Sequence, residues 1–309
     1  MRYEGYYDSC GEGRIHYYKW VPVCTPKAVI QIVHGIAETA ERYEDAAVYF
    51  NRLGYVVVAE EHMGHGKSVA FQQGYFEGGW LSAVKDTLRL TEIMQQEYLA
   101  LPHAFYGHSM GSFILRTILC SISQCRIDAA VISGTGWQPR TALPTLELIS
   151  TSFCRKEGPK AQSSFLNKLV FGSYNVKVEH RQTEYDWLTR DRAMVKAYLR
   201  DPDCGFTITN GLLRDLTVGL RIVENPKNLF QMTKNLPVLF TAGTMDPVGG
   251  YGKGVKRTVS EFKKAGMEDV TMKLYPLCRH ELLNEINRQE ILKDISCWLE
   301  EKLFKEEKI

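Results

Sequence analysis

The chain has 309 residues, of which 44% are hydrophobic and 24% are charged, and its formal net charge is +2. These values are ordinary for a globular protein, and so small a charge gives no reason to expect a nucleic-acid partner. The length suits one large α/β domain, or a core domain with a sizeable insertion. The N-terminal residues lack the apolar run of a signal peptide, and no window has the roughly 18 apolar residues of a transmembrane helix, so we expect a cytoplasmic location.

The eight cysteines are scattered along the chain, and no two of them form a C-x-x-C pair. A zinc site, which usually draws on such pairs, is therefore not expected, and we predict neither a metal nor a cofactor. In a chain of this length without a secretion signal, the cysteines are expected to be free thiols in a reducing compartment.

Short apolar runs alternate with helical patterns along most of the chain. Aromatic-rich segments near the N-terminus predict a β-hairpin with strands at 3–7 and 14–20. Further buried strands are predicted at 28–33, 55–59, 103–106, 127–133, 238–242 and 270–275. Helices are predicted at 42–53, 80–98, 110–121, 254–265 and 285–304. This alternation indicates βαβ units, and hence an α/β fold with a mostly parallel central sheet flanked by helices.

The alternation is interrupted after Gly136. Residues 137–220 have helical periodicity but no convincing buried strand, and the strand–helix pattern resumes at 238. We therefore predict a core formed by residues 1–136 and 221–309, with a helical insertion at 137–220 between two halves of one sheet.

The sequence Gly107-His108-Ser109-Met110-Gly111 is a G-x-S-x-G motif that directly follows a predicted strand and precedes a predicted helix. A serine in this setting acts as a nucleophile, because it sits on a sharp, strained turn that exposes its hydroxyl. The turn is crowded, so the positions two before and two after the serine must be nearly free of side chain. Ser109 is therefore the candidate catalytic nucleophile.

A serine hydroxyl is a poor nucleophile at neutral pH and needs a base. In the fold that carries this turn, an acid and then a histidine follow the serine along the chain. Asp246 comes just after the predicted strand at 238–242, and His280 just after the one at 270–275. Both therefore lie at the carboxyl edge of the sheet, as Ser109 does. We predict that His280 exchanges a proton with Ser109 and that Asp246 fixes the histidine tautomer.

The tetrahedral intermediate of acyl transfer carries a negatively charged oxygen, which two backbone N–H groups must bind in an oxyanion hole. One donor is expected from the residue after the nucleophile, Met110. The other is expected from the loop after the strand at 28–33, where Ile36 is the candidate.

Two further loops lie close to these residues in the predicted fold. The loop at 61–68 contains His62 and His65, and since no third ligand is placed nearby, a turn that supports the site is favoured over a metal site. Cys278 precedes His280 by two residues, and it either borders the pocket or is a small buried residue.

The segments QIVHGIAE, HMGHGKS, YGHSMG, TAGTMDPVGGYGKGV and YPLCRHELLNE together resemble the monoacylglycerol lipase and lysophospholipase branch of the α/β-hydrolases, also described as serine aminopeptidase-like. The resemblance covers nearly the whole chain and is weakest over 137–220. It implies an α/β-hydrolase fold with a helical cap over the site. It further implies a nucleophile, acid and base at Ser109, Asp246 and His280, with oxyanion donors at Ile36 and Met110.

The chain departs from the usual pattern of this family at a few supporting positions. The family usually has Asp and Arg where this chain has Glu61 and Met63, and often Gly at the position of Leu277 or Cys278. Because these residues lie in supporting loops, we expect the departures to affect substrate preference more than catalysis.

The resemblance implies a serine hydrolase that cleaves carboxylic esters of single-chain lipids, such as monoacylglycerols or lysophospholipids, through an acyl-enzyme. An aminopeptidase or another small-molecule esterase would use the same three residues. A peptidase would also need an acidic cap residue to hold the substrate amine, with the candidates Glu147, Glu157, Glu179 and Glu184. A non-catalytic binding protein on the same scaffold is a third alternative, although such proteins often lack one of the three residues.

Selectivity is expected to come from the cap at 137–220. Its apolar side chains either pack the cap onto the core, which is expected for most of them, or line an acyl-chain tunnel and form a rim that touches a membrane surface transiently. These side chains include Leu143, Leu146, Leu148, Ile149, Phe153, Phe165, Leu166, Leu169, Val170 and Phe171. The sequence gives neither the acyl-chain length, nor the head group, nor the oligomeric state.

Overall fold

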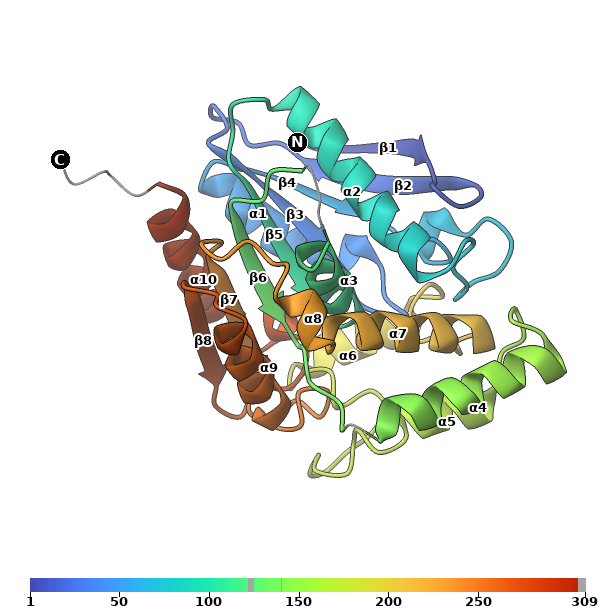
Figure 1. Cartoon of the computed structure of the whole chain (residues 1–309). Helices are drawn as coiled ribbons and strands as arrows, with labels where there is room; N and C mark the ends of the chain where they lie inside the picture. The colour runs from blue at the N-terminus through green and yellow to red at the C-terminus, as the bar shows by residue number, and fades with distance from the viewer. Residues whose placement is uncertain (122–124, 140, 305–309) are drawn as a thin grey trace.

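The computed structural model describes residues 1–121, 125–139 and 141–304, and its centre is an eight-stranded sheet with the strand order β1-β2-β4-β3-β5-β6-β7-β8 (Figure 1). The strands are β1 (Arg2–Asp8), β2 (Arg14–Trp20), β3 (Ala28–Val33), β4 (Tyr55–Glu60), β5 (His103–His108), β6 (Ala129–Ser133), β7 (Val238–Gly243) and β8 (Val270–Tyr275). Strand β2 pairs antiparallel with β1 and β4, and the other neighbours run parallel. The predicted α/β class with a mostly parallel sheet is confirmed.

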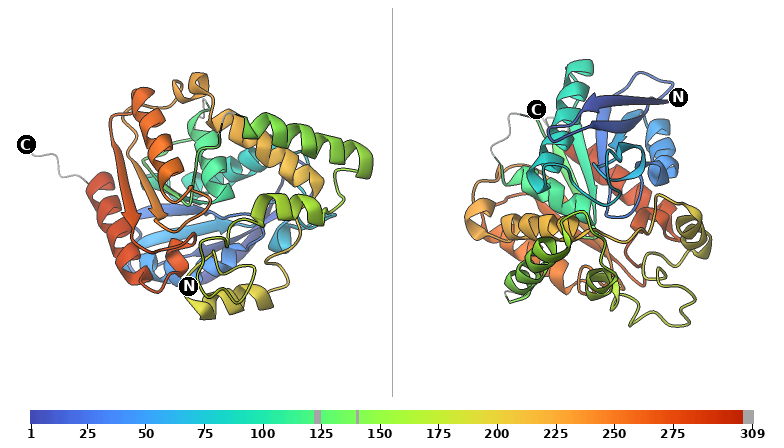
Figure 2. Two further views of the ribbon diagram at one scale, coloured as in Figure 1. Left: turned by 90° about the horizontal axis from the view of Figure 1, so that it is seen from below. Right: turned by 90° about the vertical axis from the view of Figure 1, so that its right-hand side faces the viewer.

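The central strands are apolar on both sides because helices cover both faces of the sheet (Figure 2). All residues of β3, β4 and β5 are buried. On one face, α1 (Glu44–Arg52) and α10 (Arg288–Leu303) share an apolar cluster with the strands. On the other face, α2 (Trp80–Glu97), α3 (Met110–Leu119) and α9 (Lys253–Lys264) do the same. Within the described ranges, no helix is both long and apolar enough to cross a membrane.

The segment between β6 and β7 lies beyond the carboxyl ends of the parallel strands (Figure 1). It contains α4 (Ala142–Glu157), α5 (Ser164–Phe171), α6 (Arg192–Arg200), α7 (Asn210–Val223) and α8 (Pro226–Leu229). The side chains of Asp191 and Thr209 cap α6 and α7 by accepting backbone N–H groups of the first turn. Helix α7 crosses the predicted boundary at 220 and packs against both α3 and α4, so the division into core and insertion stays a prediction.

The ends of the other predicted elements differ from the structure for local reasons. The predicted helix at 42–53 begins as a 3-10 turn, Ala40–Tyr43, before α1. The predicted helix at 285–304 begins only at Arg288. Residues Leu282–Asn284 form a separate 3-10 turn, and the Glu285 carboxylate after it is engaged by Arg190.

Candidate active site

Ser109 is held at the sharp turn between β5 and α3. Its backbone has φ 52° and ψ −120°, a costly conformation for a residue with a side chain, and Ser109 N donates to Ser133 O at 3.0 Å. Packing requires both glycines of the motif: a Cβ on Gly107 would lie 2.8 Å from Gly111 O, and one on Gly111 would lie 2.0 Å from Val33 O. The turn therefore has the strained strand–turn–helix form that the motif predicts.

Asp246 and His280 follow β7 and β8 and meet at the same end of the sheet. His280 Nδ1 lies 3.0 Å from Asp246 Oδ1, which also accepts Val248 N at 2.9 Å. An ionised carboxylate can only accept, so Nδ1 carries the proton and Nε2 is the free basic nitrogen. Ser109 and His280 line one cavity, and Asp246 is buried behind His280. The structure thus brings the three residues to one place, while their catalytic roles stay a prediction.

The His280 ring is buried beside two other rings, with centroids 4.6 Å from His108 and 5.0 Å from Trp187. Burial lowers the pKa of His280, but the charge and hydrogen bond of Asp246, together with the charges of Glu281 and Glu38, outweigh this effect, so the pKa lies above its ordinary value of 6.5. Burial and the neighbouring His280 hold the pKa of His108 well below that value. Of these two histidines, His280 is therefore the one suited to take up a proton.

The loop after β3 passes close to the nucleophile. A Cβ on Gly35 would lie 3.0 Å from Ser109 Cβ. Ile36 lines the cavity, and its N–H donates to no group in the described part of the chain. Met110 is the first residue of α3, so its N–H has no acceptor within the helix. The two predicted oxyanion donors are thus available beside Ser109, and their role stays a prediction.

The histidines of the 61–68 loop fix the loop that carries Ile36. His65 Nε2 accepts Ala37 N at 3.2 Å, and His34 Nε2 accepts His62 N at 3.0 Å. Burial and the neighbouring His62 lower the pKa of His65 to about 3, so its ring stays neutral and keeps its acceptor nitrogen. These bonds give the loop the supporting role that its sequence favours.

Sequence reasoning missed an ion network that joins the segment after β3 to the loop that carries His280. Arg42 donates to both carboxylate oxygens of Glu281, at 2.7 and 2.6 Å, and to Glu38 Oε2 at 2.7 Å. Burial raises the pKa of Glu281, but Arg42 outweighs this effect and holds the pKa below its usual value. The i,i+4 spacing of Glu38 and Arg42 signals half of the network. No local pattern in the sequence signals the other half, the pairing of Arg42 with Glu281.

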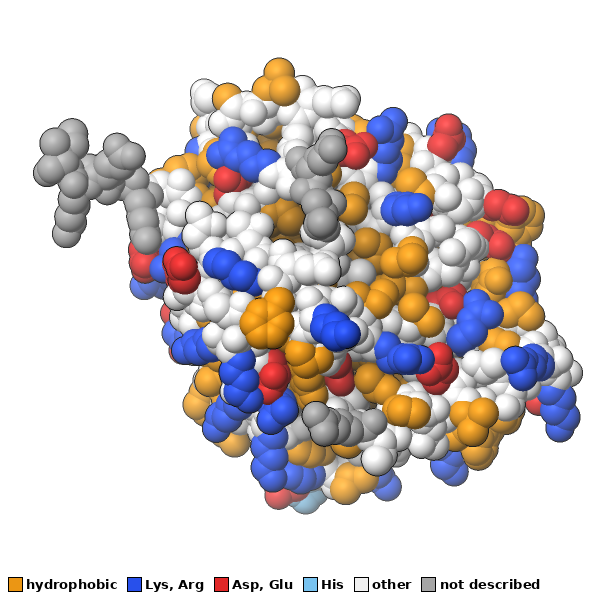
Figure 3. All heavy atoms as spheres, viewed as in Figure 1, with side chains coloured by type: hydrophobic (Ala, Val, Ile, Leu, Met, Phe, Trp, Pro, Cys, Tyr) orange, Lys and Arg blue, Asp and Glu red, His pale blue; other side chains and the backbone are white. Residues whose placement is uncertain are grey.

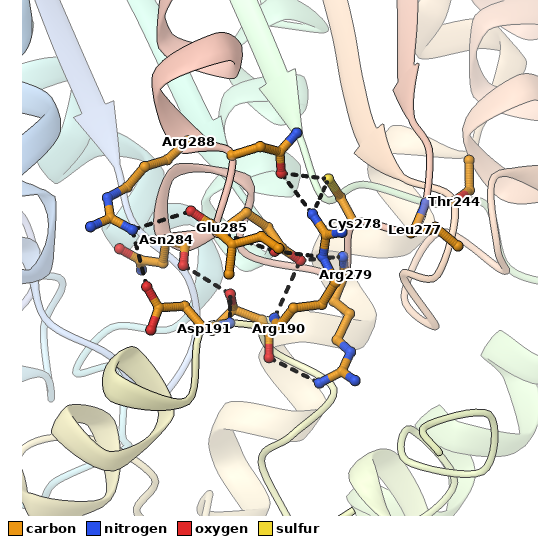
Figure 4. Close-up of polar contacts among 12 residues, drawn as sticks. Arg190, Asp191, Thr244, Leu277, Cys278, Arg279, Asn284, Glu285 and Arg288 are labelled. Carbon is orange, nitrogen blue, oxygen red and sulfur yellow. Dashed lines mark hydrogen bonds and ion pairs between the residues drawn. The ribbon is translucent and has the colours of Figure 1, made fainter. Parts of the chain in front are cut away.

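The loop between β8 and α10 is braced by the residues just before α6 (Figure 4). Glu285 accepts Arg190 Nε at 2.9 Å and Arg279 N at 2.7 Å. Arg190 Nη2 also donates to Asn287 Oδ1 at 2.7 Å and to Cys278 Sγ at 3.2 Å. Cys278 is fully buried within this network. Of the two interpretations of Cys278, a small buried residue and a residue that borders the pocket, the structure therefore supports the first.

The cavity in front of Ser109 and His280 has a volume of about 760 Å³, and most of its wall comes from the segment between β6 and β7. The apolar and aromatic side chains that line it include Ile36, Phe171, Trp187, Leu188, Tyr198 and Phe206. The polar and charged side chains that line it include Asn167, Lys168, Arg181, Gln182, Thr183 and Glu184. The substrate-contacting residues predicted within 137–220 would come from this set.

Among the apolar residues of 137–220 that were candidates for a tunnel, Phe171 lines the cavity and the others do not. Leu143 and Leu166 are buried in the core cluster, in keeping with the packing role expected for most of these residues. Leu148 and Phe165 are 70% and 59% exposed. On the face seen in Figure 3, hydrophobic side chains lie among lysine and arginine side chains.

A sequence model of the hydrolase family described as serine aminopeptidase, S33, matches residues 25–287. The chain belongs to this family. A monoacylglycerol lipase of Mycolicibacterium smegmatis is 30% identical to this hydrolase over 303 residues, which cover 96% of this chain and 97% of the relative. The resemblance to the monoacylglycerol lipase branch that the sequence indicates is confirmed.

Solved structures agree with the fold of this hydrolase. A thermostable carboxyl esterase from Bacillus coagulans, solved with glycerol, matches with a TM-score of 0.89 and 25% identity, over 98% of this chain and 99% of that one. A soluble variant of a monoglyceride lipase from Saccharomyces cerevisiae, solved with a substrate analogue, has a TM-score of 0.80 and covers 99% of this chain and 96% of that one. At 19% identity, that second likeness supports the fold alone. The predicted α/β-hydrolase fold is confirmed.

Proposed function

We propose that this hydrolase cleaves carboxylic esters of single-chain lipids, with monoacylglycerols as the first substrates to test. The observation that carries the proposal is that the strained Ser109 lines the same cavity as His280, which is hydrogen-bonded to Asp246. The names of the relatives, a monoacylglycerol lipase and a carboxyl esterase, point in the same direction.

In the proposed mechanism, Ser109 Oγ attacks the ester carbonyl while His280 Nε2 takes up the hydroxyl proton. Asp246 keeps the proton on Nδ1 and stabilises the cation that forms on the ring. The N–H groups of Ile36 and Met110 bind the tetrahedral oxyanion. His280 then gives its proton to the leaving alcohol, and water releases the acyl group by the same steps in reverse.

We further propose that residues 137–220 act as a cap that selects the substrate, since they supply most of the cavity wall. A volume of about 760 Å³ lies within the range of pockets for single small ligands, so it suits one acyl chain with its head group and not three chains. Lys168 and Arg181 in the wall would pair with a phosphate, so lysophospholipids are the second class to test. Transient contact of the cap with a membrane surface stays a prediction.

Activity is expected to rise from acetyl to medium-chain p-nitrophenyl esters and then to level or fall. Each methylene buried against the apolar wall contributes roughly 0.8 kcal/mol, or about fourfold in binding. The first measurement is kcat/KM along the ester series. The second is hydrolysis of monoacylglycerol, lysophospholipid and triacylglycerol, and we expect no hydrolysis of triacylglycerol. Phe171→Ala should reduce the gain for each methylene, whereas Phe165→Ala should not, because Phe165 lies on the same helix and faces solvent.

An aminopeptidase is the second candidate, and one observation favours it. Of the four acidic residues that the sequence offers for holding a substrate amine, Glu184 lines the cavity. A preference for acetyl esters, refusal of long chains and cleavage of aminoacyl p-nitroanilides would contradict the lipid proposal. If Glu184→Gln then removed the anilide cleavage alone, the peptidase would take its place with the same three catalytic residues.

Activity is expected to fall as the pH is lowered through a pKa above 6.5. His280 must be neutral to accept the proton of Ser109, and Asp246 raises the pKa of His280 despite its burial. The inactive protonated form therefore predominates on the acid side of this pKa. The dependence of kcat/KM on pH, which reports the free enzyme, measures it between about pH 5 and 9. A flat profile with rate-limiting chemistry, or a midpoint below 6.5, would contradict the assignment of His280 as the base.

A further inference from the structure

Two groups from the segment between β6 and β7 hold the backbone of the loop that carries Ile36. Tyr198 Oη, on α6, donates to Ala37 O at 2.7 Å, and Gly205 N donates to the same oxygen at 2.9 Å. We propose that Tyr198 is a positioning residue whose hydroxyl, together with Gly205 N–H, fixes the direction of the Ile36 N–H in the oxyanion hole. The inference rests on the ester hydrolysis proposed above, and it makes the cap a structural part of the catalytic machinery.

Ala37 is the residue at which such fixing matters. Its φ is 54°, a left-handed conformation that a residue with a side chain rarely adopts unless its surroundings impose it. Ala37 N donates to His65 Nε2 at 3.2 Å. The N–H of Ala37 is therefore held by the 61–68 loop, and its carbonyl oxygen is held by Tyr198 and Gly205. On the other side of Ile36, Gly35 N donates to Glu38 Oε1 at 2.5 Å. The Ile36 N–H is therefore an available amide between two neighbours that are both held.

The surroundings of Tyr198 keep its hydroxyl in place as a donor. Its ring lies 4.8 Å from the Arg42 guanidinium and 5.0 Å from the Tyr185 ring. Burial raises the pKa of Tyr198 well above its ordinary value, so the hydroxyl keeps its proton over the pH range of activity. Tyr185 Oη donates to Gly205 O at 2.9 Å and thereby steadies the second donor.

The direct test is Tyr198→Phe, which removes the hydroxyl and keeps the ring against Arg42. Loss of a whole oxyanion donor lowers kcat by roughly 10²–10³, and since Gly205 N–H remains, we expect a loss of about tenfold. KM for p-nitrophenyl butyrate should stay within about twofold, because the oxyanion exists only after attack. Affinity for a trifluoromethyl ketone, whose adduct with Ser109 carries the oxyanion, should fall by the same factor as kcat. Affinity for the uncharged ether 1-O-octylglycerol should not change.

Two further variants make the test specific. Tyr49→Phe is the matched control, because Tyr49 lies on α1 and its hydroxyl contacts Ser296 at 3.4 Å; kcat and both affinities should stay at wild-type values. Gly205→Ala should lower kcat and ketone affinity together. Gly205 has φ 67°, and a Cβ there would lie 3.1 Å from atoms of both Tyr185 and Tyr198.

Unchanged kcat and ketone affinity in Tyr198→Phe would overturn the positioning role. Equal weakening of the ketone and of the ether would overturn it too, because that result would indicate a general change of cavity shape. Failure of the proposed ester hydrolysis at Ser109 has a different signature, since the wild-type chain would then neither hydrolyse the ester nor react with a fluorophosphonate.

Discussion

Replacement of Ser109 by alanine is expected to lower kcat for ester hydrolysis by roughly 10⁴–10⁶ and to abolish labelling by a fluorophosphonate. The hydroxyl oxygen of Ser109 would form the ester bond of the acyl-enzyme, and alanine offers His280 no nucleophile to activate in its place. Alanine keeps the length of the backbone and fits the φ of 52° no worse than serine does, so the fold should be retained. The measurement is the rate with p-nitrophenyl butyrate, with 1-O-octylglycerol binding as a check that the cavity is intact.

Ser150→Ala is the matched control for this substitution. Ser150 is a buried serine of α4 whose hydroxyl donates to Glu147 O at 3.2 Å, so its replacement should leave labelling and hydrolysis unchanged. Hydrolysis that persists in Ser109→Ala would contradict the mechanism. A wild-type chain that binds the ether but neither hydrolyses esters nor accepts the probe would instead be a binding protein on a hydrolase scaffold.

The sheet and the turn that carries Ser109 could be predicted because their signals are local. Strands β3 and β4 are apolar runs buried throughout, and the two glycines around Ser109 are imposed by contacts within the turn itself. Asp246 and His280 needed one further step. The carboxyl ends of parallel strands meet at one edge of a sheet. Residues that directly follow such strands are therefore expected to lie close together, although they are far apart in the sequence.

The loop supports and the cavity wall could not be predicted, because they join residues that are far apart in the sequence. Arg42 and Glu281 are separated by 239 residues, and Tyr198 and Ala37 by 161, and neither pair has a spacing that marks it. Within 137–220 the apolar pattern indicates helices but does not show which face meets the cavity. Helix α5 carries both the exposed Phe165 and the cavity-lining Phe171, and the packing of that helix on its neighbours decides between them.

Replacement of Asp246 by asparagine is expected to lower kcat by about 10⁴. Asp246 Oδ1 accepts both His280 Nδ1–H and Val248 N, whereas buried Oδ2 has no hydrogen-bond partner in the described part of the chain. If the asparagine places its oxygen at Oδ1, the His280 tautomer is kept, but the charge is lost and an amide NH₂ is buried without an acceptor. If it places its nitrogen there, the amide opposes Val248 N–H and forces the proton of His280 onto Nε2, which removes the base.

The pH profile of this variant separates the two arrangements. With the tautomer kept and the charge removed, the burial of His280 is opposed only by the smaller influence of the Glu281 and Glu38 charges, so the acid limb of kcat/KM should move below its wild-type position. With the tautomer inverted, the residual rate should show no His280 limb. Asp86→Asn is the matched control, because Asp86 is also buried but accepts hydrogen bonds from Ser9 Oγ and Cys10 N, and none of these residues lines the cavity. Its kcat should stay within about twofold of wild type. A loss of less than tenfold in Asp246→Asn, with the acid limb unmoved, would contradict the proposal that Asp246 orients His280 and stabilises its protonated form.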